Sequence, residues 1–223
     1  MSELLLINLS ELEPGTPAFL ESITAVAARV SAGEIAIAPI ESSYIFLCDA
    51  FNRDAVIKLH QLRGDAPGTA CQVLVASTST LPGIAQQLPD SMRILAEEFW
   101  PGLLTLMVRP NSSLNWDLGD GGVLDTFAVR VPNQVFLQEL IAKVGPVAIA
   151  SASMSGQPPS LSLSQTSALP TELSIYIDGG DFQSAALSTV VAENAPGYVH
   201  CTRIGAISLE ELRKVLPTIG ASN

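Results

Sequence analysis

The stretch IAIAPIESSYIFLCDAFNRDAVIKLHQLRG, residues 35–64, decides the fold of this chain. It opens with two short apolar runs, Ile35–Ala38 and Tyr44–Cys48, which a polar segment separates. Runs of this length between polar residues are typical of buried strands. Asn52 is a good N-cap for the helix that follows, and Gly64 is a suitable residue to end it. The stretch therefore predicts strand, turn, strand and helix.

The same alternation of apolar runs and capped helices continues on both sides of this stretch. Pro17–Val30 carries apolar residues at helical spacing upstream. Downstream, Asp90 and Asn133 are expected to cap helices, and Ser208 with Glu211 forms a capping box. Strands that alternate with helices indicate an α/β fold with a twisted, mostly buried open sheet flanked by helices.

Composition favours a well-buried globular chain. Apolar residues make up 48% of the sequence and charged residues only 15%, which argues against disorder. No repeat or linker divides the chain, so we predict one domain over residues 1–223 with its core at about 17–216. The apolar runs are much shorter than the roughly 20 residues of a membrane span, and the N-terminus shows no export signal. We expect a cytoplasmic protein without membrane contact.

Charge and metal-ligating residues limit the choice of partners. The three cysteines are far apart, and the two histidines have no partner at metal-ligand spacing, so neither a disulfide framework nor a metal site is expected. The net charge is −11, and the eleven Lys and Arg residues are spread thinly. Strong direct binding of nucleic acid needs a basic stripe and is therefore disfavoured. A small anionic ligand held by two or three arginines remains open.

Three polar loops could carry a binding site. They are Pro39–Ser43, Arg63–Ala70 and Ser151–Gly156, and each adjoins a predicted strand or helix end. Ligands of open α/β sheets bind in such loops, where Ser and Gly offer hydroxyl and backbone N–H groups to anions. Ordinary turns have the same composition. No common nucleotide fingerprint occurs, and His60 and His200 fall inside a predicted helix and strand, where structural residues are expected.

Six segments, taken in order, carry a stronger signal than any single loop. PIESSY at 39–44 precedes a helix that leads into RGD at 63–65, and FWPGLLTL begins at Phe99. AVRVP and GPVAIASASMSGQPP follow, and STVV with TRIGAI after it forms the sixth segment. These strings resemble P-T-[DE]-T-V-Y, K-x-R, the uncommon F-W-P-G-x-L-T-L and the later motifs of the YrdC-like threonylcarbamoyl-AMP synthases. From about Pro39 to Gly205 the chain is identified as a divergent member of that family.

The resemblance implies both a fold and a reaction. The fold is YrdC-like, with a large concave site. The activity is that of an L-threonylcarbamoyladenylate synthase, a nucleotidyltransferase that converts threonine, bicarbonate and ATP into threonylcarbamoyl-adenylate and pyrophosphate. The product serves the N6-threonylcarbamoyladenosine (t6A) modification of tRNA. ATP with Mg²⁺, threonine and bicarbonate are thus the expected small-molecule substrates, and tRNA-modification proteins the expected partners.

The matched positions name the expected site residues, and none of them forms a metal site. Arg63 and Arg130 are expected to be catalytic. ATP is expected to contact Arg63, Ser151, Ser153, Ser188 and Arg203, and threonine to contact Ser42, Tyr44 and Ser155. Cations and hydrogen-bond donors are the groups that stabilise a departing pyrophosphate. We expect the three arginines to meet in one hollow.

Several matched positions depart from the family pattern, and they concentrate in the expected site. The replacements are Ile40 for Thr, Arg63 for Lys, Asp65 for Arg, Ala70-Cys71 for Pro-Leu and Ser153 for Asn. Asp65 places a negative charge where a polyphosphate is expected, which Coulomb repulsion disfavours. Two alternatives to the synthase therefore stay open. One is a relative that binds nucleotide but has lost the reaction, and the other is an RNA-binding module.

Overall fold

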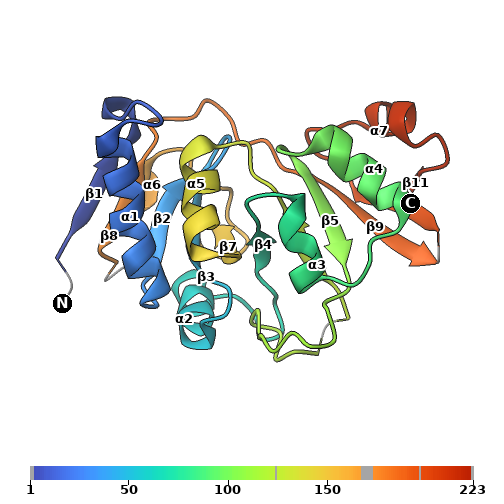
Figure 1. The fold of residues 1–223 in the computed structure, drawn as a ribbon, viewed down its shortest axis with the longest axis horizontal. Helices are drawn as coiled ribbons and strands as arrows, with labels where there is room; N and C mark the ends of the chain where they lie inside the picture. Colours follow the sequence, from blue (N-terminus) through green and yellow to red (C-terminus); the bar gives the residue numbers. More distant parts are fainter. Residues whose placement is uncertain (1–2, 124, 167–172, 196, 222–223) are drawn as a thin grey trace.

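A computed structural model describes residues 3–123, 125–166, 173–195 and 197–221 (Figure 1). The strands are β1 (Leu5–Asn8), β2 (Ala36–Pro39), β3 (Tyr44–Asp49), β4 (Gln72–Leu74), β5 (Leu104–Val108), β6 (Phe127–Arg130), β7 (Val147–Ser151), β8 (Ile175–Asp178), β9 (Thr189–Ala195), β10 (Tyr198–Arg203) and β11 (Gly220–Ala221). The helices are α1 (Pro17–Ser31), α2 (Arg53–Arg63), α3 (Leu81–Ile84), α4 (Asp90–Phe99), α5 (Val135–Val144), α6 (Leu163–Thr166) and α7 (Leu209–Val215). Two 3-10 turns, η1 (Leu9–Glu11) and η2 (Thr78–Thr80), complete the elements.

All these strands join one mixed sheet in the order β1-β8-β2-β3-β7-β4-β6-β5-β9-β10-β11. The sheet contains parallel pairs, such as β2 with β8 and β5 with β9, and antiparallel pairs, such as β3 with β7. The sheet runs the length of the molecule, with β1 near one end and β11 near the other (Figure 1). The predicted α/β class, with helices flanking a sheet, is confirmed.

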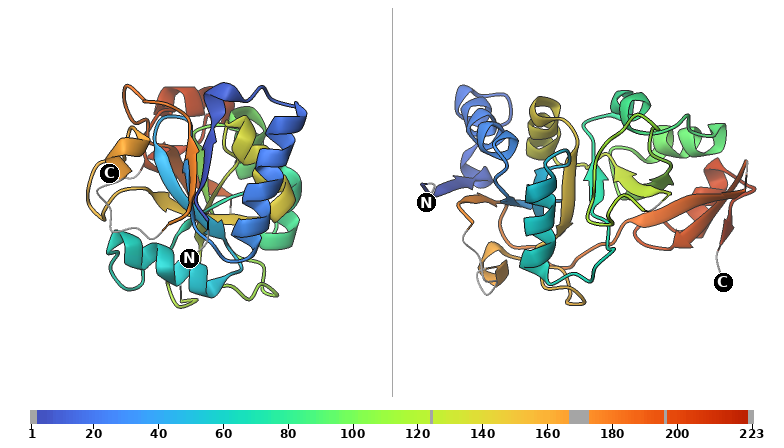
Figure 2. Two further views of the ribbon diagram at one scale, coloured as in Figure 1. Left: turned by 90° about the vertical axis from the view of Figure 1, so that its left-hand side faces the viewer. Right: turned by 90° about the horizontal axis from the view of Figure 1, so that it is seen from below.

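Helices cover both faces of the sheet. Helices α1 and α5 pack against each other on one side, with α4 further along the same side, whereas α6 lies on the opposite side (Figure 2). The alternation of side chains in β3 shows how the sequence sets these layers. Ile45 and Leu47 join the buried cluster beneath α1 and α5, and Phe46 and Cys48 join the cluster that α2 covers. Both faces of β3 are therefore buried, which explains its unbroken apolar run.

The predicted helix ends are confirmed at some positions and wrong at others. Asn52 accepts a hydrogen bond from Ala55 N at 3.0 Å, and Gly64 ends α2 in the left-handed region at φ +66°. The capping box of α7 is also present. Asp90, however, is the first residue of α4 and caps nothing. The cap of α5 is Gln134 instead of Asn133, because the Gln134 side chain accepts from Leu137 N.

The sequence patterns missed the smallest elements. Helix α3 and the two 3-10 turns have four residues or fewer, and so they show no helical period in the sequence. Strands β1 and β11 join the sheet from outside the expected core of residues 17–216. None of the described helices is long and apolar enough to cross a membrane.

Candidate functional site

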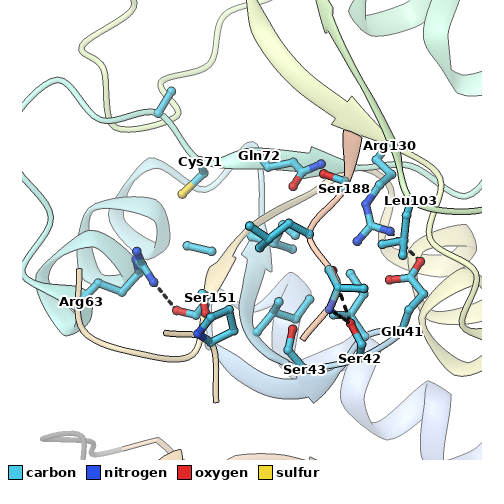
Figure 3. A pocket seen from close by; sticks show the side chains of 18 of the residues that line it. Glu41, Ser42, Ser43, Arg63, Cys71, Gln72, Leu103, Arg130, Ser151 and Ser188 are labelled. Atoms are coloured by element: carbon cyan, nitrogen blue, oxygen red, sulfur yellow. Dashed lines mark hydrogen bonds and ion pairs between the residues drawn. The ribbon is translucent and has the colours of Figure 1, made fainter. Parts of the chain in front are cut away.

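A cavity of about 290 Å³ lies beside the turn between β2 and β3 (Figure 3). The loop after α2, the end of β7 and the segment before β9 form its other walls. Six expected site residues line it: Ser42, Arg63, Arg130, Ser151, Ser188 and Arg203. The structure thus brings the three arginines into one hollow, as the sequence predicts. The role of each residue stays a prediction.

Arg130 lies on the last position of β6 and is 4% exposed. Its Nη1 donates to Glu41 Oε1 at 2.6 Å and to the Gly102 carbonyl at 3.1 Å. Glu41 Oε1 also accepts from the backbone N–H of Asn133 at 2.7 Å. Among the described residues, no hydrogen-bond partner exists for Glu41 Oε2 or Arg130 Nε, although both atoms are buried. The Arg130–Glu41 ion pair therefore forms one wall of the cavity, and each of its two side chains keeps one buried polar atom without a hydrogen bond to any residue that the structure describes.

Arg203 belongs to a second polar group on the same cavity. Its guanidinium donates to the Ser188 carbonyl and, from Nη2, to Ser188 Oγ at 3.0 Å. Ser188 Oγ lies 2.7 Å from Thr105 Oγ1, which also accepts from Gln72 Nε2 at 2.9 Å. Partial burial lowers the pKa of Arg203, but an arginine remains charged at neutral pH. The hydroxyl of Ser188 is therefore oriented by a chain of contacts rather than free to rotate.

Arg63 is the last residue of α2 and sits opposite Arg130 (Figure 3). Its Nη1 donates to the carbonyls of Ser151 and Ser153, and its Nε donates to Asp65 Oδ2 at 2.9 Å. The Asp65 side chain is only 3% exposed. Burial by itself would raise the pKa of Asp65, but hydrogen bonds from Arg63, His60 and Ser155 hold the pKa below its usual range. The sequence places this negative charge beside the expected polyphosphate, and the structure pairs it with Arg63 and His60.

Cys71, His60 and Asp65 have the outline of a nucleophile, a base and an orienting acid. Cys71 Sγ lies 3.3 Å from His60 Nε2, and His60 Nδ1 lies 2.9 Å from Asp65 Oδ2. Two observations argue against a nucleophile here. Burial raises the pKa of the Cys71 thiol to about 12, and His60 Nε2 also lies 2.9 Å from the Leu118 carbonyl, which calls for a proton on that nitrogen. We assign His60 a structural role, as the sequence predicts.

Three expected contact residues do not line this cavity. The Tyr44 side chain is fully buried, and its hydroxyl donates toward Asp178 Oδ1 and the Gly180 carbonyl, while Gly179 N donates to it. Tyr44 thus anchors the chain after β8 and does not face the hollow. Ser153 offers its carbonyl to Arg63 and its hydroxyl to Ser151, and Ser155 contacts Asp65. Both serines therefore contact the Arg63–Asp65 pair instead of the cavity.

Sequence reasoning missed Glu41, Gln72 and Thr105 as site residues. Glu41 and Gln72 line the cavity, and Thr105 joins them through Ser188. Glu41 falls inside the PIESSY string, so its position in that motif was an available signal. Thr105 falls inside the FWPGLLTL string, which gave the same signal, but it lies in an apolar strand and is 2% exposed, so its position favours a core residue.

The cavity is a positive region on an acidic protein. Three arginines line it against two carboxylates, Glu41 and Asp65, whereas the whole chain carries −11. No group of three or more His, Cys, Asp or Glu residues in the described part of the chain could hold a metal ion. A larger cavity of about 750 Å³ lies between η2, α3 and α4, but its lining contains none of the expected site residues. The first cavity is therefore the candidate site for an anionic ligand.

The fold and this basic cavity define a class of α/β protein, and comparison with known proteins identifies the family. The family model Sua5_yciO_yrdC, described as "Telomere recombination", matches residues 28–205. The chain belongs to this Sua5/YciO/YrdC family. The predicted YrdC-like membership is confirmed.

Relatives and solved structures agree with the assignment. The chain is 35% identical to a protein named "Putative threonylcarbamoyl-AMP synthase" from Mycobacterium tuberculosis, and the match covers 90% of this chain and 91% of that protein. It is 30% identical to the threonylcarbamoyl-AMP synthase of Mus musculus, over 91% of this chain and 73% of the relative. The crystal structure of Pyrococcus abyssi Sua5 complexed with L-threonine superimposes with a TM-score of 0.85 at 26% identity. That match covers 99% of this chain but only 63% of the archaeal chain.

Proposed function

We propose that this protein is a threonylcarbamoyl-AMP synthase, which forms threonylcarbamoyl-adenylate and pyrophosphate from threonine, bicarbonate and ATP. The observation that carries the proposal is the meeting of Arg63, Arg130 and Arg203 in one cavity. Relatives named for this activity match the chain over about nine-tenths of its length. A structural neighbour of similar fold binds L-threonine. The product would serve t6A modification of tRNA.

The chemistry requires cations at the polyphosphate. The threonine amine and bicarbonate first condense to threonylcarbamate, with loss of water. A carbamate oxygen of this intermediate then attacks the α-phosphorus of ATP, a new P–O bond forms, and the bond from the α-phosphorus to the bridging oxygen of the β-phosphate breaks. The electron pair of that bond leaves with pyrophosphate, so negative charge grows at the β-phosphate in the transition state. Fixed positive groups stabilise such charge most effectively when they need not reorganise. Arg63 and Arg203, each held by protein contacts, meet that requirement.

The remaining polar groups suggest a division of the cavity. Ser188 Oγ, oriented by Arg203 and Thr105, and Ser151 would contact the nucleotide. Ser42 lies on the cavity wall opposite Arg63, and a hydrogen bond from Ala186 N at 2.8 Å holds its hydroxyl in place (Figure 3). From that position Ser42 would contact threonine. Tyr44 has no direct part in this proposal. Ser155 and Ser153 would act through Arg63.

Magnesium would enter with ATP as its phosphate complex. Both carboxylates of the cavity are ion-paired, Glu41 with Arg130 through Oε1 and Asp65 with Arg63 and His60, which lowers their capacity to neutralise a cation. The ion would therefore be held by phosphate oxygens and water instead of by protein carboxylates. Transfer to tRNA would fall to partner proteins, since the chain is acidic overall.

Two alternatives differ from this proposal in measurable ways. A relative that has lost the reaction would bind ATP but release no pyrophosphate. An RNA-binding module would be retained on a polyanion column at low salt, which the net charge of −11 disfavours. The compensated state of Asp65 removes the main physical objection to activity.

The test is threonine-dependent pyrophosphate release from ATP and bicarbonate. Wild type should release pyrophosphate only when all three substrates are present. Arg203→Gln should reduce kcat/KM for ATP by about tenfold or more, because it removes a cation beside the phosphates. Arg53→Gln is the matched control, since Arg53 is largely exposed and pairs with Asp117 outside the cavity. Absence of threonine-dependent release by the wild type, with ATP binding intact, would refute the proposal in favour of the inactive relative.

A further inference from the structure

Asp65 is an acidic residue at a site that is proposed to bind an anion, and its charge alone does not explain its role there. The residue lines a cavity that is proposed to hold a polyphosphate, yet it brings a negative charge. Its carboxylate oxygen Oδ2 lies 2.9 Å from Arg63 Nε and 2.9 Å from His60 Nδ1. The carboxylate is therefore shared by two basic side chains and largely shielded from solvent.

The contacts of Arg63 show what this sharing achieves. Nε donates to Asp65, and Nη1 donates to two backbone carbonyls. In the part of the chain that the structure describes, Nη2 has no hydrogen-bond partner, and it is not among the buried unsatisfied atoms. One nitrogen with two N–H groups thus remains for a ligand. Because the rest of the guanidinium is already fixed, binding would cost little side-chain entropy.

His60 completes the network from the other side. Its two ring nitrogens lie 2.9 Å from Asp65 Oδ2 and 2.9 Å from the Leu118 carbonyl, and both oxygens are acceptors. These two contacts hold the ring in one orientation beside the carboxylate. Gly119 lets the loop close over the ring, because a Cβ at that position would lie 2.0 Å from His60 Nε2. Arg63 and His60 thus hold the Asp65 carboxylate from two sides.

We propose that Asp65 is a positioning residue: its shared carboxylate fixes Arg63 so that Nη2 faces the cavity and binds the polyphosphate. The identity of the anion rests on the proposed function. The positioning rests on the contacts of Arg63 and His60 alone. A simple consequence separates this inference from Coulomb repulsion. Removal of the negative charge at Asp65 should weaken binding of a polyanion, whereas repulsion predicts that the same change should tighten it.

The test is the affinity of the full chain for ATP and for inorganic pyrophosphate, measured by titration calorimetry at constant ionic strength. Asp65→Asn keeps the shape of the side chain and removes its charge. We expect its affinity for both probes to fall by about tenfold, because an oriented charged hydrogen bond is lost. Asp54→Asn is the control, since it removes the same charge from an exposed position at the start of α2. Unchanged or tighter binding by Asp65→Asn would overturn the inference.

A second variant keeps the test decisive if Asp65→Asn does not fold. Arg63→Lys preserves the positive charge and restores the family residue, so a pure charge model predicts wild-type affinity. A single ammonium cannot serve Asp65, two carbonyls and a ligand together, and we expect about a tenfold loss of affinity. In a kinetic assay, both variants should raise KM for ATP and leave KM for threonine within about twofold. Wild-type affinity of Arg63→Lys would contradict the inference.

A third measurement does not depend on the nature of the ligand. Nitrogen-15 NMR should show slowly exchanging arginine Nε–H resonances, and Arg63→Lys should remove one of them, which assigns it to Arg63. In Asp65→Asn the resonance should shift and exchange faster, because its acceptor is no longer charged. If wild type binds neither ATP nor pyrophosphate, the proposed function fails while this result still supports the positioning by Asp65. An Nε–H that is unaffected by Asp65→Asn would overturn that positioning.

Discussion

Replacement of Arg130 by methionine should destabilise the protein strongly, because it leaves Glu41 as a buried, uncompensated charge. The two side chains are 5% and 12% exposed, and Nη1 meets Oε1 at 2.6 Å. Glu41 would retain one donor, the backbone N–H of Asn133 at 2.7 Å. Loss of one partner of a buried ion pair typically costs about 3–5 kcal/mol. We expect a loss near the lower end of that range, about 3 kcal/mol, because the Asn133 contact survives.

Urea denaturation followed by circular dichroism gives the free energy of unfolding for each variant. Glu41→Gln supplies the other side of a double-mutant cycle, because its amide oxygen can still accept from Asn133 N. The double variant Arg130→Met/Glu41→Gln should be more stable than the sum of the single losses, with a coupling of at least about 1 kcal/mol. A loss below about 1 kcal/mol for Arg130→Met would refute the reasoning, since exposed, screened pairs have that magnitude.

Three further predictions concern acid stability, loop closure and thiol reactivity. Because the folded pKa of Asp65 is lowered, its stabilisation is complete above the unfolded pKa of about 3.9 and is lost as pH falls through the folded pKa. The stability difference between wild type and Asp65→Asn should therefore shrink in urea titrations as pH falls below about 4, and a constant difference would contradict this. Gly119→Ala should lower stability by about 2 kcal/mol or more, because φ is +105° and the new Cβ would meet His60; Gly121→Ala, at φ +72° with open space around it, is the control that carries only the backbone strain. Cys71, with its thiol pKa raised to about 12 by burial, should react with iodoacetamide far more slowly at pH 7.5 than glutathione does, by mass spectrometry, and comparable rates would show that the thiol is accessible and ionised.

The sequence by itself determined the longer elements and the family. Asn52 and Gly64 mark the two ends of α2, because a capping side chain and a left-handed residue act within a few residues of a helix end. The apolar run Tyr44–Cys48 predicted a buried strand, and the structure places β3 there. Motifs such as FWPGLLTL then identified the family, since their order along the chain needs no knowledge of distances.

Only the tertiary structure decided the meaning of the charges in the site. In the sequence, Asp65 is a negative charge that should repel a polyphosphate. In the folded chain its carboxylate contacts both Arg63 and His60 and is almost fully buried. Tyr44 matches a motif position, yet its place on β3 turns the hydroxyl toward Asp178 and away from the cavity. The physical reason is that Coulomb energy and hydrogen bonding depend on separation and burial. Neither separation nor burial can be obtained from spacing along the chain, because groups that meet at the site lie up to 144 residues apart.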